Sequence, residues 1–277
     1  MRRLFLYPPQ INYCQSVSFS YDYFMPDSTN PYTVGVSALK ATELTDQVAS
    51  DSPYGPAKDS RGVMKIAQAG LIFSALTSFF SIGFSGKAWM AYNTGESDFL
   101  FWNSDGSESS YTEYWEILNI TVVISYIVSL VLFQFWNNRS VKNSWALSEN
   151  KQFPEISPGW AVGFYFIPVV SLWKPFQIMK DTWKRCAPEN HVSPLIHLWW
   201  TLWIASTSSS QIASRLLDSE TADYGTAMAW SIGDDIILII SSLILIFIIR
   251  TITARQLDQI QNSTLVDSVV EISVANG

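Results

Sequence analysis

Charged residues are scarce in this sequence: 15% of its 277 positions are Asp, Glu, Lys or Arg, whereas 48% are hydrophobic. The helices of a soluble bundle carry charges on nearly every turn of their outer faces, and four long runs of this chain carry almost none. Each run is close to the roughly 20 residues that cross a bilayer core about 30 Å thick. We therefore expect four transmembrane helices, at 63–84, 117–136, 195–217 and 226–249.

Positive charge is the scarcer sign, with 17 Lys and Arg against 24 Asp and Glu and a net charge of -7. This balance excludes a basic nucleic-acid-binding surface, so no nucleic-acid partner is expected. The acids concentrate in loops 85–116 and 218–225, and the basic residues gather in the other connections. Because basic loops stay in the cytoplasm, the two acidic loops should be external and both termini cytoplasmic.

Cysteine and histidine are also rare, with two residues of each. Cys14 and Cys186 fall on the expected cytoplasmic side, where thiols stay reduced, so no disulfide is expected. His191 and His197 are six residues apart, whereas a zinc-binding helix presents two histidines four residues apart on one face. The sequence has no phosphate loop and no GxSxG motif. We expect no metal, no cofactor and no catalytic residues, and hence no enzyme.

One stretch differs from the four runs: residues 157–185, SPGWAVGFYFIPVVSLWKPFQIMKDTWKR. Its apolar part, 159–173, is too short to span a bilayer, and three prolines within the stretch resist a continuous helix. The stretch is expected to enter the membrane from the cytoplasm, break near Pro168 and return. If it crossed instead, the basic segments on its two sides would lie on opposite faces of the membrane.

The second half of this stretch has the pattern of a helix lying in the membrane interface. Large apolar residues recur on one face, and the polar and charged residues Lys174, Gln177, Asp181 and Lys184 occupy the other. Basic and aromatic side chains together favour binding of anionic lipid headgroups or of a protein partner. A helix that only anchors the chain to the membrane surface would show the same pattern. The residues that carry this prediction are Trp160, Trp173, Lys174, Phe176, Lys180, Trp183, Lys184 and Arg185.

Asp234 and Asp235 are the strongest signal of an intramembrane site, because they lie about eight residues inside the fourth run. Acids within a span usually face a partner or a cavity. Arg215, near the end of the preceding run, is a candidate counter-ion. Two other polar features accompany them: small serines recur at helical spacing in the first run, and 206–215 is unusually polar for a span. Alternatively, the fourth helix is set low and both acids lie at the outer headgroups.

The chain is expected to have three regions. Residues 1–60 lack any hydrophobic period and predict a disordered cytoplasmic tail. Residues 61–255 form the four-span membrane domain, and 256–277 a polar cytoplasmic tail. The fold class is therefore all-α: a polytopic membrane protein with four transmembrane helices and a re-entrant or interfacial broken helix on the cytoplasmic side.

The central stretch, with Arg139, Asn143, Ala146 and Leu147 before it, closely resembles a family of bacterial integral membrane proteins known as domain of unknown function 4328. The resemblance extends over about 61–255. It implies a multi-pass protein of the bacterial inner, or plasma, membrane, and it brings no known activity. One position differs, because Ser171 stands where the family commonly has Asn. The motif residues that it singles out are Arg139, Asn143, Pro158, Gly159, Pro168 and Pro175.

Two functions are compatible with these observations. The first is a non-enzymatic scaffold or sensor whose cytoplasmic rim binds lipid headgroups, a protein partner or a second copy of the chain. The alternative is a transporter or channel component that uses the Asp pair and the serine faces. This alternative predicts a water-accessible cavity between the spans.

Overall fold

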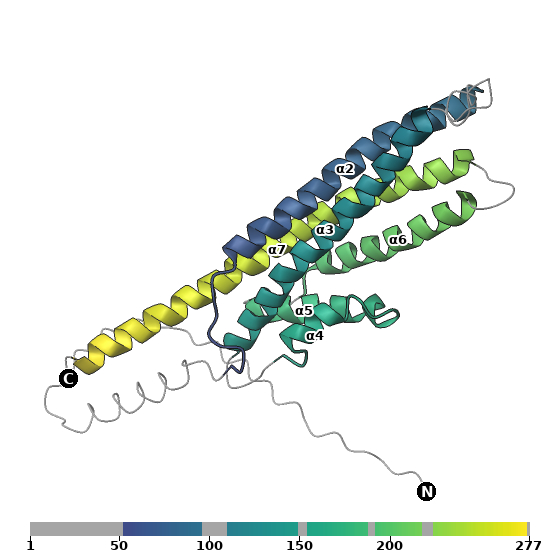
Figure 1. Cartoon of the computed structure of the whole chain (residues 1–277). Helices are drawn as coiled ribbons and strands as arrows, with labels where there is room; N and C mark the ends of the chain where they lie inside the picture. The colour runs from purple at the N-terminus through teal and green to yellow at the C-terminus, as the bar shows by residue number, and fades with distance from the viewer. Residues whose placement is uncertain (1–51, 96–109, 149–153, 188–191, 218–223, 276–277) are drawn as a thin grey trace, which may run out of the picture.

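The computed structural model describes residues 52–95, 110–148, 154–187, 192–217 and 224–275. Within these ranges the chain is helical and contains no strand, which confirms the predicted all-helical fold. In chain order the elements are α2 (Arg61–Thr94), α3 (Ser110–Ala146), α4 (Pro158–Gly163), the 3-10 turn η3 (Val170–Leu172), α5 (Lys174–Cys186), α6 (Pro194–Leu217) and α7 (Tyr224–Ala275) (Figure 1).

Three of the described helices are long and apolar enough to cross a membrane, within Arg61–Thr94, Glu113–Ala146 and Gly225–Val266. They contain three of the four predicted runs. The remaining run, 195–217, forms α6, which at 24 residues has the length of a span. Its composition is less apolar, because the polar run that begins at Ser206 occupies its second half.

The long helices pack side by side in the order α3, α2, α7, α6. α2 packs extensively on α3 and on α7, and α6 packs on α7, whereas α3 and α6 have almost no direct contact. Small residues permit the close approach of α2 to its neighbours. Ser74, Ser78, Ser81 and Ser85, predicted from their spacing to form one stripe, are all buried. The main apolar core lies at the end of the bundle next to α5, and it includes Trp136, Ile248 and Ile252.

Residues 158–186 form a helical hairpin beside this core. α4 ends at Gly163, and the chain turns through Pro168 and Val169 before α5 begins. Val169 has φ 68° and ψ −55°, and β-branched residues rarely adopt a positive φ. Pro158 and Pro175 lie in the first turns of α4 and α5, where a missing N–H leaves no bond unmade. The predicted break near Pro168 is therefore present.

The apolar face of α5 packs on the protein. Met179 and Trp183 are buried in the main core, at 1% and 6% exposure. The guanidinium of Arg255 on α7 lies 4.5 Å from the centre of the Trp183 ring. The amphipathic pattern that predicts contact with lipid is thus satisfied by contact with the bundle, because either surface requires the same helical spacing of apolar residues.

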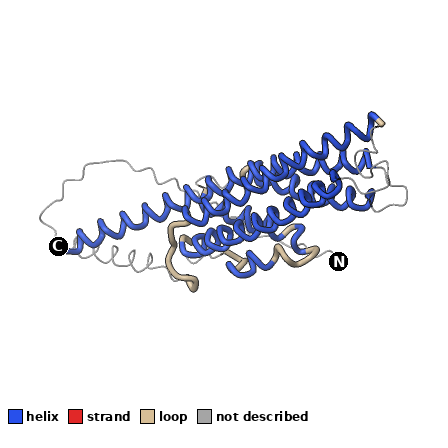
Figure 2. The backbone as a smooth tube through the Cα atoms, turned by 45° about the horizontal axis from the view of Figure 1, so that its top comes forward, coloured by secondary structure: helices blue, strands red, loops and turns tan. Residues whose placement is uncertain are grey.

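The segments assigned to the two tails are partly described. Residues 1–51 lie outside the described part of the chain, whereas 52–60 contact α3. Asn143 binds the backbone of Lys58 in both directions: Lys58 N–H donates to Asn143 Oδ1 at 3.0 Å, and Asn143 Nδ2 donates to the Lys58 carbonyl at 2.9 Å. At the other terminus α7 continues as a helix to Ala275, well past the rest of the bundle (Figure 2).

Candidate functional site

A cavity of about 640 Å³ lies between α2, α3, α6 and α7. Each helix contributes polar side chains to its wall. At the end of the cavity nearest the α4–α5 hairpin, called the inner end below, the wall is formed by Phe133, Trp199 and Tyr165, which lies in the turn that follows α4. The Tyr165 and Phe133 rings are 5.8 Å apart. Polar residues of the wall include Ser81, Tyr126, Ser206, Ser231, Asp234 and Asp235.

The two acids reach the cavity in different directions, because consecutive residues of a helix point about 100° apart. Asp235 is 7% exposed and faces α2, where the hydroxyls of Ser78 and Ser81 are directed toward its carboxyl. The Ser78 hydroxyl is buried without a well-formed hydrogen bond. Asp234 faces α6 and accepts a hydrogen bond from Ser206 Oγ at 2.5 Å. The pair therefore connects α7 to both of its neighbours at the same level.

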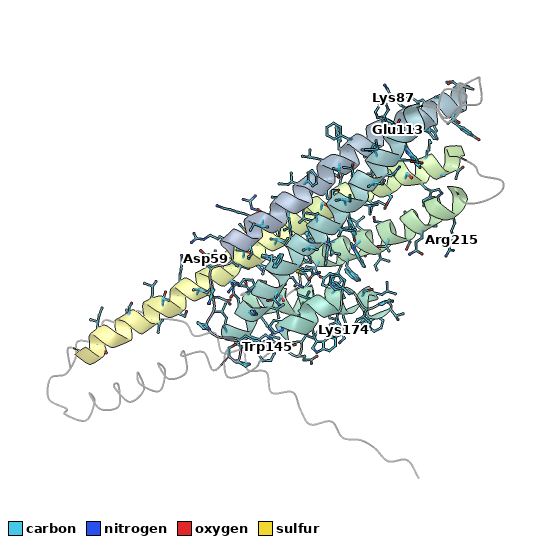
Figure 3. The ribbon with its side chains drawn as sticks, viewed as in Figure 1. Asp59, Lys87, Glu113, Trp145, Lys174 and Arg215 are labelled. Carbon is cyan, nitrogen blue, oxygen red and sulfur yellow. The ribbon has the colours of Figure 1, made fainter. Side chains whose placement is uncertain are left out.

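No Lys, Arg or His is present among the described residues that line the cavity, so its wall is acidic. Arg215, the predicted counter-ion, is exposed toward the end of α6 and is not part of the wall (Figure 3). Among the described residues, no group of three His, Cys, Asp or Glu could hold a metal ion.

Aromatic side chains also line the cavity. Trp203 Nε1 on α6 donates a hydrogen bond of 3.3 Å to Tyr126 Oη on α3, which joins the two helices that otherwise hardly touch. The Trp203 ring stacks on Trp200 with centroids 4.7 Å apart. The hydroxyl of Tyr165 is buried with no hydrogen-bond partner in the described part of the chain. Neither Tyr126 nor Tyr165 was among the residues predicted from the sequence.

Residues 113–254 match the family model described as Domain of unknown function (DUF4328). The chain belongs to this family. The match runs from α3 into α7, so it contains the hairpin, α6 and both cavity acids, while α2 lies outside it; the resemblance is therefore narrower than 61–255. No curated protein and no solved structure matches the chain.

The motif residues that the resemblance singled out lie at the end of the bundle that carries the α4–α5 hairpin, and two neighbouring asparagines of α3 hold α4 in place. Asn138 donates to the Pro158 carbonyl at 3.0 Å, and Asn137 donates to the Ala161 carbonyl at 3.1 Å, so α3 holds both ends of α4's first turn. Asn143 holds the Lys58 segment. Of the other motif residues, Pro158 and Pro175 are buried, Arg139 is half-buried, and Gly159 and Pro168 are exposed.

The basic residues of α5 line a second, smaller cleft of about 420 Å³. Lys180, Lys184 and Arg185 share it with Glu155 and Asp181, and Arg185 Nε forms an ion pair of 2.9 Å with Asp181. The other predicted rim residues are dispersed. Trp160 and Trp173 are exposed, Lys174 lies 5.9 Å from the Phe164 ring centre, and Phe176 packs on His197 and Trp200.

Proposed function

We propose that α2, α3, α6 and α7 all cross the membrane, with both termini in the cytoplasm, and that the α4–α5 hairpin enters the cytoplasmic leaflet without crossing. The polar half of α6 supports its assignment as a span, because Ser206, Thr207 and Gln211 line the cavity. Polar side chains are tolerated at membrane depth where they face a cavity. Figure 3 shows Lys87, Glu113 and Arg215 toward one end of the bundle and Trp145 and Lys174 toward the other.

The tip of the hairpin supports its entry into the leaflet. Large apolar side chains are exposed there, and a contiguous exposed apolar patch of this kind marks a protein or membrane contact. The hydrocarbon of the inner leaflet would cover them. They are Trp160, Phe166, Ile167, Val169, Leu172 and Trp173.

Cysteine accessibility tests this topology. Single cysteines at 106, 148, 187 and 222, in a background without Cys14 and Cys186, would be treated in intact cells with a membrane-impermeant thiol reagent. We expect labelling at 106 and 222 and none at 148 and 187. Labelling at 187 without labelling at 148 would mean that the hairpin crosses the membrane.

The function that the cavity supports best is binding of a cation within the membrane, as part of a transporter or channel. The observation that carries this proposal is the pair Asp234 and Asp235 in a wall whose described residues include no basic side chain. An ionised carboxylate is costly to bury unless a positive charge accompanies it. The cavity volume, about 640 Å³, falls within the range of small-molecule sites. No catalytic role is proposed for its residues.

Binding and flux measurements test this function. Purified protein in nanodiscs and in proteoliposomes would be offered Na⁺, K⁺ and organic ammonium ions. Asp234→Asn and Asp235→Asn should each weaken binding by about tenfold or more, the order expected for a close charge pair. Asp258→Asn, on the exposed continuation of α7, is the matched control and should change nothing. The size-exclusion profile of each purified variant checks that the protein is still inserted and folded. Cation binding that all three variants retain would contradict the proposal.

A second function, lipid binding at the cytoplasmic rim, is favoured by the cleft beside α5. Lys180, Lys184 and Arg185 lie together there, and each basic residue near an anionic leaflet contributes about 1 kcal/mol. Lys180→Gln with Lys184→Gln should reduce the amount of anionic lipid that remains bound after purification. Lys142→Gln, a basic residue outside the cleft, serves as control. Equal lipid retention by both proteins would exclude a rim site.

A further inference from the structure

The cavity has an open side, and it lies between α3 and α6. These two helices form the edges of the arrangement, since α3 packs chiefly on α2 and α6 on α7. Figure 1 shows α3 and α6 diverging. Val123 on α3 lines the cavity and is also 56% exposed. Thr207 on α6 likewise lines the cavity and is exposed. In the four-span arrangement this side faces the hydrocarbon of the bilayer.

Among the described side chains of α3 and α6, the hydrogen bond between Trp203 and Tyr126 crosses the open side. Trp203 Nε1 and Tyr126 Oη are 3.3 Å apart, beyond the usual optimum near 2.9 to 3.0 Å for an N–H···O bond. Both rings line the cavity. A hydrogen bond of this length is weak, so the pair can separate to admit a ligand from the side and close behind it.

The wall suits an organic cation better than a metal ion. Metal ions need several oxygen ligands around one point, and the described acids form no such cluster. Aromatic faces attract organic cations, more strongly when the site is desolvated. Trp115, Tyr126, Trp199 and Trp203 provide such faces, and Leu130 and Leu238 add an apolar surface. The unpartnered Tyr165 hydroxyl at the inner end is available to accept an N–H from the ligand.

From these observations, and on the basis of the proposed cation-binding function, we propose that the ligand is an amphiphilic organic cation that enters the cavity from the bilayer between α3 and α6. Its charge binds Asp234 and Asp235, and its apolar body contacts the aromatic and leucine side chains of the wall. Trp203 and Tyr126 form the gate. Neutral amphiphiles lack the charge that the acids require, and small hydrated ions lack the apolar body.

Two matched cations test the ligand class. Tetraphenylphosphonium and tetramethylammonium have the same charge and differ in apolar surface. Binding to protein in nanodiscs would be measured by calorimetry, with empty nanodiscs and Asp258→Asn as controls. We expect tetraphenylphosphonium to bind about tenfold or more tightly than tetramethylammonium, given the cation–π and apolar contacts of the wall, and Asp234→Asn to weaken it. If both ions bind equally and Asp234→Asn weakens both, the cation-binding function stands and the amphiphilic ligand is wrong. If neither binds, the proposed function fails as well.

Rates of entry test the gate. Trp203→Phe and Tyr126→Phe each remove the hydrogen bond and keep an aromatic ring, so the fold should persist. Both should raise the association and dissociation rates of tetraphenylphosphonium together, with a much smaller change in affinity. Trp230→Phe, at an exposed tryptophan of α7 that does not line the cavity, is the control and should leave the rates as they are. Trp115→Phe tests the outer end of the cavity. Faster entry in Trp115→Phe alone would place the route at the external aqueous end and overturn entry from the bilayer.

Discussion

Ser206 on α6 donates a 2.5 Å hydrogen bond to Asp234 on α7. The bond joins the polar half of the less apolar helix to an acid on a strongly apolar one. The bond places a hydroxyl and a carboxylate against each other on the wall of the cavity. In the proposed four-span arrangement both groups lie at membrane depth, where each alone is unfavourable.

Ser206→Ala should lower the stability of the α6–α7 contact. Hydrogen bonds between helices in membranes contribute about 0.6 kcal/mol on average and at most about 1.7 kcal/mol, and the charged acceptor favours the upper end of that range. Thermal unfolding of the purified protein measures the effect. Ser208→Ala is the control, because the Ser208 hydroxyl is exposed and bonds only the Ile204 carbonyl of its own helix. Equal unfolding temperatures for the two variants would contradict this account.

Gly70→Ala should separate α2 from α3. An added Cβ would lie 3.0 Å from Leu132 Cδ1 and 3.2 Å from the Ser129 Cα, and the backbone atom cannot yield easily. Overpacking of this kind destabilises by about 1–3 kcal/mol. Gly83→Ala, in the same helix with nothing within 4 Å of the new Cβ, should instead be neutral or slightly stabilising. The comparison requires only the two unfolding temperatures. A similar change in both variants would mean that the close contact between Gly70 and α3 does not decide the outcome.

The sequence was sufficient to predict features that depend on local pattern. Hydrophobic runs long enough to cross a bilayer predict three of the described helices, and the prolines of the hairpin predict the break near Pro168. Both features follow from composition along one segment. For Asp234 and Asp235 the sequence left open whether the acids face a cavity or lie at the outer headgroups; in the structure both line the cavity, and Asp235 is buried.

Features that depend on which surfaces meet could not be predicted in this way. The apolar face of α5 has the same spacing whether it meets lipid or protein, so the burial of Met179 and Trp183 in the core was not foreseeable. Tyr126 and Tyr165 come from separate elements and meet in one cavity only because the hairpin folds back beneath α3. Nothing in either local sequence distinguishes these tyrosines from those of an interfacial belt.

The Cys186 thiol should react slowly in the folded protein. Burial at the end of α5 raises its pKa to about 11 from the ordinary value of 9.0, although nearby Arg255 opposes the shift. The thiolate is the reactive form, so labelling by a maleimide near neutral pH should be much slower than at Ser148→Cys, which is partly exposed. Unfolding in detergent should remove the difference. Fast labelling of Cys186 in the folded protein would show that the α5 contact opens readily.

The same shift predicts a dependence of stability on pH. A pKa that is higher in the folded state than in the unfolded state favours folding while the thiol is neutral in both. This contribution is fully present below pH 9 and is lost as the pH rises from about 9 toward 11. Cys186→Ser should remove the dependence in that interval. An unfolding temperature that falls equally in the variant would assign the change to other groups.

Asn143→Ala should release the segment that precedes α2. Asn143 makes two hydrogen bonds to the Lys58 backbone, and its Nδ2 also lies 3.5 Å from Gln256 Oε1 on α7, so one side chain connects three parts of the chain. Each bond contributes about 0.5–1.5 kcal/mol, and together they hold Lys58 and Arg61 against the bundle. Limited digestion with trypsin should cleave the variant after these residues much faster than the parent protein. Asn262→Ala, an exposed amide on the α7 continuation, is the control. Unchanged cleavage in Asn143→Ala would mean that buried Ser60 and the start of α2 hold the segment without the amide, and that this motif residue has another role.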